Sequence, residues 1–304
     1  MDWVAFELAQ ILAGVPTSQP GLEISIGGIE LEAVGDELRL GLAGVGFSVS
    51  IDSVRVAYPA SIRLRPGQRL EIQTGHSGAW FYVLPSAKID MDPVLGSLAT
   101  HARYAIGPRG GKILRPGDEI TLRGSTLPIF EYEASFPDLA NNDPIRVILG
   151  PQDDLFDRAD VETFLSAEFR LTSRNDRMAY VLAGPRIQPE TSYDIVTDGT
   201  ALGSIQVAGD GSPYVLMVDR STTGGYPKIA TIIRAEIGRF AQKRTGDKVV
   251  FASTDVESAV TALRDLKAKL DSVGNEPRTA MINLEALNRG DGAAGGCDAL
   301  LFDT

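Results

Sequence analysis

The chain has 304 residues, of which 43% are hydrophobic, enough for two domains with separate cores. Its formal net charge of −11 argues against a nucleic-acid partner, which requires a basic surface. One cysteine, Cys297, and two histidines exclude internal disulfides and predict no metal centre. No apolar run approaches the roughly 20 residues of a membrane helix. Residues 1–15 lack a basic leader region, so we expect a cytoplasmic protein without a membrane partner.

The first predicted element is a helix over residues 2–14, with Asp2 as its N-cap. After this helix, the spacing of the apolar residues changes. Apolar and polar residues alternate from residue 22 to residue 84, as in Leu22-Glu23-Ile24 and Leu38-Arg39-Leu40, and turn pairs such as Gly35-Asp36 separate the runs. This pattern is typical of short antiparallel strands in a barrel or sandwich.

A short turn motif recurs at residues 65–70, 115–120 and 244–249. The first two copies read Arg-Pro-Gly followed by Gln or Asp, and the third reads Arg-Thr-Gly-Asp. Proline presets the first corner of such a turn and glycine supplies a positive φ at the second. Each copy is therefore predicted to lead into a strand.

The polar residues 123–144 are the expected connection to a second domain. That domain is expected to begin at Ile145, and there we predict strands at 146–150, 203–207 and 214–218, and one or two short helices within 154–169. A longer helix is predicted after residue 253, with Thr254 and Glu257 as a capping box. Its expected buried face is Val256, Ala259, Val260, Leu263, Leu266 and Leu270. The Gly- and Asp-rich tail from residue 274 is expected to be partly disordered.

Residues 219–242 are the stretch around which we interpret the chain. Isoleucines at helical spacing predict a helix that begins at Pro227, after a sharp turn at Gly224-Gly225. The exposed N–H groups at such a helix N-terminus, together with Lys228, would attract a phosphate or carboxylate. The alternative is a plain tight turn with a solvated Lys228.

Several blocks resemble one family. They are residues 145–156 (Ile-Arg-Val-Ile-Leu-Gly-Pro-Gln-Asp-Asp-Leu-Phe), Asn175-Asp-Arg-Met178, residues 203–207, Asp210-Gly-Ser-Pro213 and above all residues 219–228. The chain is identified as a member of the biotin-dependent carboxyltransferase-like family, and resembles the C subunit of bacterial ATP-dependent 5-oxoprolinase. That protein is also labelled allophanate hydrolase subunit 2 or KipI antagonist.

The resemblance implies a mainly β protein with a few helices and two cyclophilin-like β-barrel domains. We expect a first barrel at residues 1–135, a second barrel with the central helix at 136–273, and a tail at 274–304. Met1 matches an internal family position, so the first barrel is expected to be short at its N-terminus relative to the family. The Gln-Asp-Leu-Gly-Arg segment that usually comes first has no counterpart in this sequence.

The family also implies a function. The chain would be one subunit of a heteromeric ATP-dependent amide or lactam hydrolase, most simply a 5-oxoprolinase that opens 5-oxoproline to L-glutamate, and it would be inactive alone. Its partners would be a B-type, KipI-like subunit and an A-type subunit, with ATP used through the complex.

The expected catalytic residues are Lys228, Gln206 and Asp219. Lys228 would hold a phosphate or carboxylate, and Gln206 would either bond a substrate amide or cap a sheet edge. Arg177 is either an anion clamp or the partner of Asp176 in a structural ion pair. Backbone donors to a developing oxyanion would come from the glycine pair and its neighbours. The full set expected to bind substrate or anion is Thr223, Gly224, Gly225, Tyr226, Arg177 and Arg220.

The first half departs from the family pattern. Ala87-Lys88-Ile89-Asp90 stands where members carry Gly-Gly-Ile-Asp, and Gly96-Ser97-Leu98-Ala99-Thr100 where Gly-Ser-Arg-Ser-Thr is usual. These changes favour an alternative, a non-catalytic regulatory subunit that binds a KipI-like partner. The enzymatic alternative is the carboxyltransferase half of a urea carboxylase or allophanate system. Barrel resemblance alone does not support prolyl isomerase activity.

Overall fold

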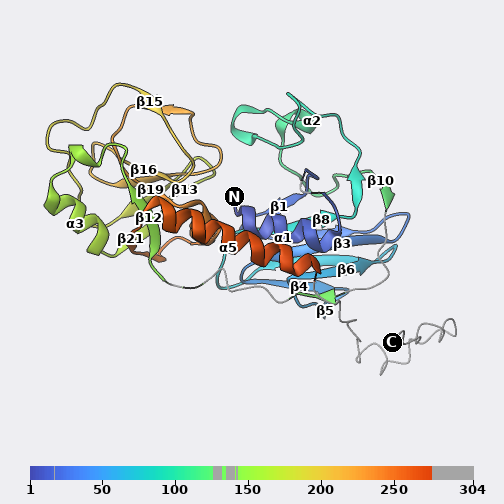
Figure 1. Cartoon of the computed structure of the whole chain (residues 1–304). Helices are drawn as coiled ribbons and strands as arrows, with labels where there is room; N and C mark the ends of the chain where they lie inside the picture. Colours follow the sequence, from blue (N-terminus) through green and yellow to red (C-terminus); the bar gives the residue numbers. More distant parts are fainter. Residues whose placement is uncertain (17, 126–131, 135–140, 142, 276–304) are drawn as a thin grey trace.

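The computed structural model describes residues 1–275, except 17, 126–131, 135–140 and 142. The described part is mainly β, as predicted, with five α-helices and three 3-10 turns. Its sheets form two groups that lie side by side (Figure 1). We refer to residues 1–134 as the N-terminal half and to residues 143–275 as the C-terminal half.

Helix α1 (Trp3–Ala13) begins where the sequence predicted. The Asp2 carboxylate accepts hydrogen bonds from the N–H groups of Val4 and Ala5, and Gly14 ends the helix at φ 68°, in the left-handed region. Apolar residues at helical spacing bury one face of α1 against strands β3 (Leu38–Gly44) and β8 (Phe81–Pro85). Local signals therefore mark both ends of this helix, and packing buries it.

The N-terminal half has two facing antiparallel sheets. One runs β1 (Leu22–Ile24), β8, β3, β6 (Ala60–Leu64) and β11 (Tyr132–Glu133). The other runs β2 (Ile29–Glu32), β7 (Arg69–Thr74), β4 (Phe47–Ile51) and β5 (Val54–Arg55). Side chains at alternate positions of both sheets fill one core, which includes Ile24, Leu40, Leu42, Val49, Ile62, Leu70 and Ile72. The alternation seen in the sequence thus matches a two-sheet arrangement.

Residues 90–121, which we name the excursion, leave this half between β9 (Ala87–Ile89) and β10 (Leu122–Ser125). These two strands pair antiparallel and form the base of the excursion. It contains η1 (Ala102–Tyr104) and α2 (Pro108–Gly111) and projects beside the C-terminal half (Figure 1). A backbone bridge between His101 and Ile106 closes the loop around η1.

The C-terminal half is built on one eight-stranded sheet. Its order is β20 (Lys248–Val249), β13 (Phe169–Asn175), β14 (Ala179–Ala183), β17 (Pro213–Leu216), β16 (Ser204–Val207), β19 (Lys228–Ile232), β12 (Ile145–Leu149) and β21 (Phe251–Ser253). Strands β20 and β21 stand at opposite ends of this order, yet only Val250 separates them in the chain. The sheet must therefore curl until its edges meet, which makes it a nearly closed barrel.

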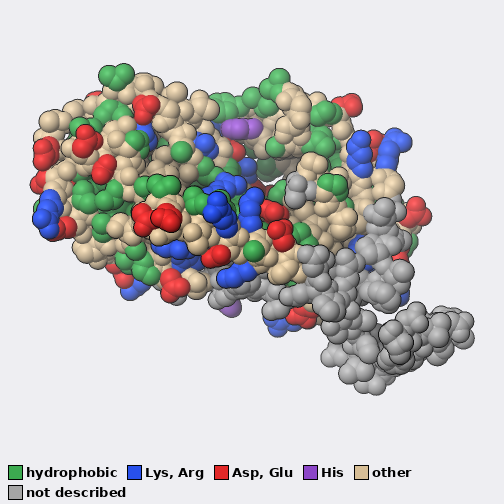
Figure 2. Space-filling model, viewed as in Figure 1, with side chains coloured by type: hydrophobic (Ala, Val, Ile, Leu, Met, Phe, Trp, Pro, Cys, Tyr) green, Lys and Arg blue, Asp and Glu red, His purple; other side chains and the backbone are tan. Residues whose placement is uncertain are grey.

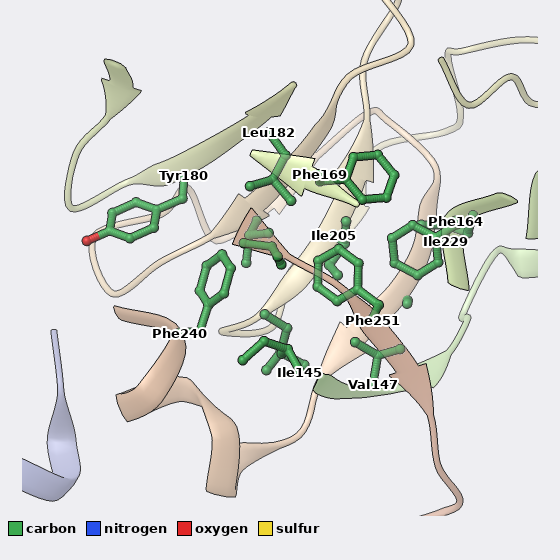
Figure 3. Packing of buried hydrophobic residues seen from close by; sticks show 14 of the residues in the cluster. Ile145, Val147, Phe164, Phe169, Tyr180, Leu182, Ile205, Ile229, Phe240 and Phe251 are labelled. Carbon is green, nitrogen blue, oxygen red and sulfur yellow. The ribbon is translucent and has the colours of Figure 1, made fainter. Parts of the chain in front are cut away.

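The barrel core is apolar and rich in phenylalanine (Figure 3). Phe164, on α3 (Arg158–Ser166), stacks on Phe251 with ring centroids 4.7 Å apart, so α3 covers the interior. The 3-10 turn η2 (Asp153–Leu155) precedes α3, in agreement with the short helices predicted here.

The prediction of a helix that begins at Pro227 is wrong for its first turns. Residues 228–232 form strand β19, and only η3 (Arg234–Glu236) and α4 (Ile237–Ala241) are helical. Ile229 and Ala230 are both fully buried although they point to opposite faces of the sheet. Because both faces of this strand are covered, its sequence lacks the alternation of apolar and polar residues that distinguishes a strand from a helix. The spacing of the isoleucines therefore suggested a helix.

Helix α5 (Val256–Asn275) confirms the helix predicted after residue 253, but its N-cap differs from the prediction. Asp255, not Thr254, accepts a hydrogen bond from the N–H of Ser258. Leu270 and Val273 are buried against α1, so α5 crosses from the C-terminal half onto the N-terminal half (Figure 1). Val256 and Val260, expected on the buried face, are 63% and 40% exposed.

The three predicted turns share one structure. In each, the backbone N–H of the arginine donates to a side-chain oxygen three residues later, on Gln68, Asp118 and Asp247 respectively. The glycines have φ of 80°, 88° and 92°. The predicted domain division at residue 135, most of the connection before 144 and the tail beyond 275 fall outside the described residues, and the domain limits stay a prediction.

Candidate functional site

Lys228 is buried at the start of β19. Its side chain is 2% exposed, and its Nζ donates to Oδ2 of Asp198 at 3.1 Å. Asp198 is 53% exposed and comes from β15 (Asp198–Gly199), outside the eight-stranded sheet. A buried ammonium requires such a partner, because removing a charge from water is costly unless an opposite charge compensates it.

Gln152 completes this polar group. Its Oε1 accepts from the backbone N–H of Lys228 at 3.1 Å, and its Nε2 donates to Oδ2 of Asp198 at 3.3 Å. The pKa of Asp198 lies below its usual value, chiefly because Lys228 donates a hydrogen bond to it. The N–H of Gly199, the charge of Lys228 and the Gln152 amide act in the same direction. Two donors from the barrel thus converge on one carboxylate oxygen.

Asp198 lies on a small ribbon at the barrel edge, which we define as residues 194–200 and 221–226. Its centre is the two-residue pairing of β15 with β18 (Thr223–Gly224). The N–H of Thr200 donates to the carbonyl of Thr222, and the N–H of Ile195 to the carbonyl of Gly225. Thr223 and Tyr226 are exposed, so the ribbon is a surface feature.

The glycine pair of the ribbon has a different role from the predicted sharp turn, because neither glycine has a positive φ. A Cβ on Gly224 would lie 2.5 Å from Nε2 of Gln206, whereas a Cβ on Gly225 would meet nothing closer than 3.6 Å. A side chain at Gly224 would therefore force the flexible end of Gln206 to move, whereas one at Gly225 would displace nothing.

Gln206 and Lys228 are direct partners on the neighbouring strands β16 and β19. Gln206 is 7% exposed and its Nε2 donates to the carbonyl of Tyr226 at 3.3 Å. The structure thus brings together six of the predicted residues, which are Lys228, Gln206, Thr223, Gly224, Gly225 and Tyr226. It adds two residues that the sequence did not single out, Gln152 and Asp198.

The predicted receptor for negative charge at a helix N-terminus does not exist. Lys228 lies in a strand, and its backbone N–H is already bonded to Gln152. No helix dipole reaches this position, so attraction for an anion depends on side chains. The alternative of a solvated Lys228 is also wrong, since the side chain is buried.

Arg177 and Asp219 form a second group, where the two halves meet. The guanidinium donates from Nε to Oδ2 of Asp219 at 2.8 Å and from Nη2 to Oδ1 at 3.1 Å. Its Nη1 also contacts Glu23 of the N-terminal half. Asp176, the predicted partner, instead caps the backbone N–H groups of Met178 and Ala179. Of the two alternatives for Arg177, the ion pair is favoured, with Asp219 as its partner.

His101 extends this second group from the excursion. Its Nε2 lies 4.0 Å from Oδ2 of Asp219, and its ring lies against Tyr104 with centroids 4.8 Å apart. Its Nδ1 is buried and has no hydrogen-bond partner within the described residues. Glu23 and His101 were missed because each is more than 100 positions away from Asp219 in the chain.

Arg220 lies between the two groups. Its Nε and Nη1 each donate at 3.4 Å, to the carbonyls of Thr200 and Met217. Asp219 is five residues from Gly224, so their Cα atoms are at most about 17 Å apart. The two groups are therefore neighbours along this part of the C-terminal half, and Arg220 contacts the ribbon. Figure 2 shows a hollow in the molecular surface between the two halves.

Two features are not found in the part of the chain that the structure describes, namely a group of metal-ligating side chains and a membrane-crossing helix. No three His, Cys, Asp or Glu side chains there are grouped so as to hold a metal ion. Among the same residues, no helix combines the length and the apolar character needed to cross a membrane.

Similar proteins agree with the resemblance seen in the sequence. The 5-oxoprolinase C subunit of Escherichia coli (strain K12) is 32% identical over 265 residues, 87% of this chain and 85% of the relative. That of Haemophilus influenzae is 29% identical over 273 residues, 90% of this chain and 87% of the relative.

Solved structures are similar as well. Kluyveromyces lactis urea carboxylase aligns with a TM-score of 0.82 and 25% identity over 92% of this chain and 27% of its own. TTHA0988 aligns with a TM-score of 0.75 and 26% identity over 83% of this chain and 49% of its own. The family model "Carboxyltransferase domain, subdomain A and B" matches residues 1–253. This chain therefore belongs to the carboxyltransferase family that contains subdomains A and B.

Proposed function

We propose that this chain is the C subunit of a heteromeric, ATP-dependent 5-oxoprolinase, which opens the lactam of 5-oxoproline to L-glutamate. The observation that carries the proposal is the 32% identity to a 5-oxoprolinase C subunit along 87% of this chain and 85% of the relative. Because the alignment covers most of both chains, it supports a hydrolase-subunit role for the whole protein. Both relatives are named as subunits, which supports a multi-subunit assembly.

In this proposal, the chain works with an A-type and a B-type, KipI-like subunit, and ATP is consumed by the complex. Lactam opening requires activation of an unreactive amide, and nucleotide hydrolysis supplies the free energy. The described residues of this chain would contribute positioning and charge to that reaction. We place the complex in the cytoplasm.

The Lys228 group is the proposed reaction site. The Lys228 ammonium would hold the substrate carboxylate or a phosphate, and the Gln206 amide would bond the lactam group beside it on the neighbouring strand. The backbone N–H groups near Thr223, Gly224, Gly225 and Tyr226 would face a developing oxyanion. The position of the barrel relative to the N-terminal half would be held by Arg177, Asp219 and Arg220.

The test is reconstitution. The chain is co-expressed with the products of its neighbouring genes, and ATP-dependent release of glutamate from 5-oxoproline is measured. We expect Lys228→Met, which keeps the aliphatic stem, to reduce release to about 1% or less while the complex still assembles. Absence of ATP-dependent release by the wild-type set would reject the proposal. Complex formation with no turnover would favour the regulatory alternative.

Carboxyl transfer is the second candidate function. Its support is the similarity in fold to Kluyveromyces lactis urea carboxylase, with a TM-score of 0.82 and 25% identity. It predicts that the chain moves a carboxyl group from carboxybiotin to a small amide without any A-type subunit. Incubation with free carboxybiotin and urea, followed by measurement of biotin and of carboxylated urea formed in equal amounts, distinguishes this activity from lactam hydrolysis and from simple release of CO2.

A further inference from the structure

The Lys228 ammonium is inaccessible in this structure. Its side chain is 2% exposed, and the Asp198 carboxylate occupies the position where a ligand would contact Nζ. The proposed function gives Lys228 a direct contact with substrate. That function therefore requires the Asp198 carboxylate to move away from Nζ before a ligand can bind there.

The ribbon that carries Asp198 is weakly attached to the barrel. Asp198 and Gly199 are both exposed, and so is Val196, at 92%. The ribbon's two segments are joined to each other by a ladder of two residues on each strand and by the backbone hydrogen bonds of Thr200 and Ile195, contacts that would move with the ribbon. Among the described residues, its first strand is held to the barrel by the hydrogen bonds from Lys228 and Gln152 to Asp198, and by the long one from Arg220 to a backbone carbonyl. Few contacts of this kind permit local opening at small cost.

The donors beneath Asp198 are built for an oxygen anion. Nζ of Lys228 and Nε2 of Gln152 reach the same oxygen, Oδ2, at 3.1 and 3.3 Å. Gln152 is held in turn by the backbone of Lys228, to which it donates and from which it accepts. When Asp198 moves away, these two donors stay in place. A neutral ligand would leave the buried ammonium uncompensated, whereas a carboxylate or phosphate oxygen would replace what was lost.

We propose that Asp198 is a built-in anion that occupies this site until an anionic ligand group displaces it and the ribbon opens. The inference rests on the proposed function for the role of Lys228 and adds the chemical class of the group that binds there, a carboxylate or phosphate oxygen. It also assigns a regulatory role to the ribbon. Asp198 competes with the ligand, so its charge lowers ligand affinity.

The experiment compares Asp198→Asn with the wild type, both as the full chain and in the co-expressed complex. Binding of 5-oxoproline and of inorganic phosphate is measured separately by calorimetry, and the neutral lactam 2-pyrrolidinone is the reference. We expect Asp198→Asn to bind at least one of the two anions about tenfold more tightly, with 2-pyrrolidinone unaffected. A gain for 5-oxoproline identifies a carboxylate as the displacing group, and a gain for phosphate alone identifies a phosphate.

Two further variants test whether the gain in affinity comes from charge loss on the ribbon in general and whether it depends on Lys228. Asp194→Asn removes an exposed charge from the same ribbon and should leave both affinities unchanged. Asp198→Asn combined with Lys228→Met should lose the gain. Hydrogen exchange of the amides of residues 195–200 should accelerate when the anion binds to the wild type.

The outcomes separate this inference from the proposed function. If Asp198→Asn binds both anions no more tightly than the wild type, in the isolated chain and in the complex, Asp198 is a fixed structural partner and the inference is wrong. If its affinity rises but the complex never releases glutamate, the displacement stands and the 5-oxoprolinase assignment fails.

Discussion

Gly224 lies against the side-chain amide of Gln206, so closely that a Cβ on Gly224 would come within 2.5 Å of Nε2. Gly224→Ala should push Gln206 away from the Tyr226 carbonyl and away from Lys228. We expect the KM for 5-oxoproline in the reconstituted complex to rise at least about tenfold, because a 1 Å displacement of a positioning group has effects of this size.

Gly225→Ala is the matched control. Its Cβ would have 3.6 Å of clearance and its φ suits any residue, so activity should stay within about twofold of the wild type. Equal losses from the two substitutions would show that the close approach of Gly224 to Gln206 does not matter.

Arg177 should contribute to stability by joining the two halves. Arg177→Met leaves the carboxylates of Asp219 and Glu23, which are 16% and 24% exposed, without their shared partner. We expect the free energy of unfolding in urea to fall by about 1–3 kcal/mol, less than for a fully buried pair because water still reaches these groups. Arg158→Met, which removes a pair on a 91% exposed arginine, should cost under about 0.5 kcal/mol. Similar values for both variants would contradict this role.

Helix α5 should stabilise the contact between the halves through its last turns. Leu270 is fully buried beside α1, so Leu270→Ala should lower the free energy of unfolding by about 2–4 kcal/mol. Val256→Ala, in the exposed first turn of the same helix, should change it by less than about 0.5 kcal/mol. Denaturant unfolding of both variants tests this difference, and a small effect at Leu270 would mean that α5 is not anchored there.

Tyr180 should make the protein less stable in alkali. Burial raises the pKa of Tyr180 to about 12, and its hydroxyl accepts from Trp80 Nε1 and donates to the carbonyl of Ala241. An unfolded tyrosine ionises near pH 10. Between about pH 10 and 12 the unfolded state therefore loses a proton that the folded state keeps, and the free energy of unfolding falls as pH rises.

Tyr180→Phe should reduce that pH slope by the contribution of one proton, at most about 1.4 kcal/mol per pH unit. At neutral pH it should cost about 1–2 kcal/mol for the lost hydrogen bonds. Urea unfolding of both proteins at pH 7, 10 and 11 measures the two effects. An unchanged slope in the variant would assign the alkaline sensitivity to other groups, such as Tyr82, whose pKa burial also raises.

What the sequence by itself determined is local. The Asp2 cap, the alternating strands and the three Arg-x-Gly turns depend on interactions within a few residues, and each formed as predicted. The block at residues 219–228 also correctly indicated the family.

Only the tertiary structure decided the rest. Strand β19 lies in a barrel that covers both of its faces, so its hydrophobic pattern carried no period that excludes a helix. The partner of Lys228 is 30 positions away, and Glu23 meets Arg177 from 154 positions away. Such pairs depend on how the barrel closes and how the halves dock, because ionic contacts require proximity in space and leave no periodic trace in the chain.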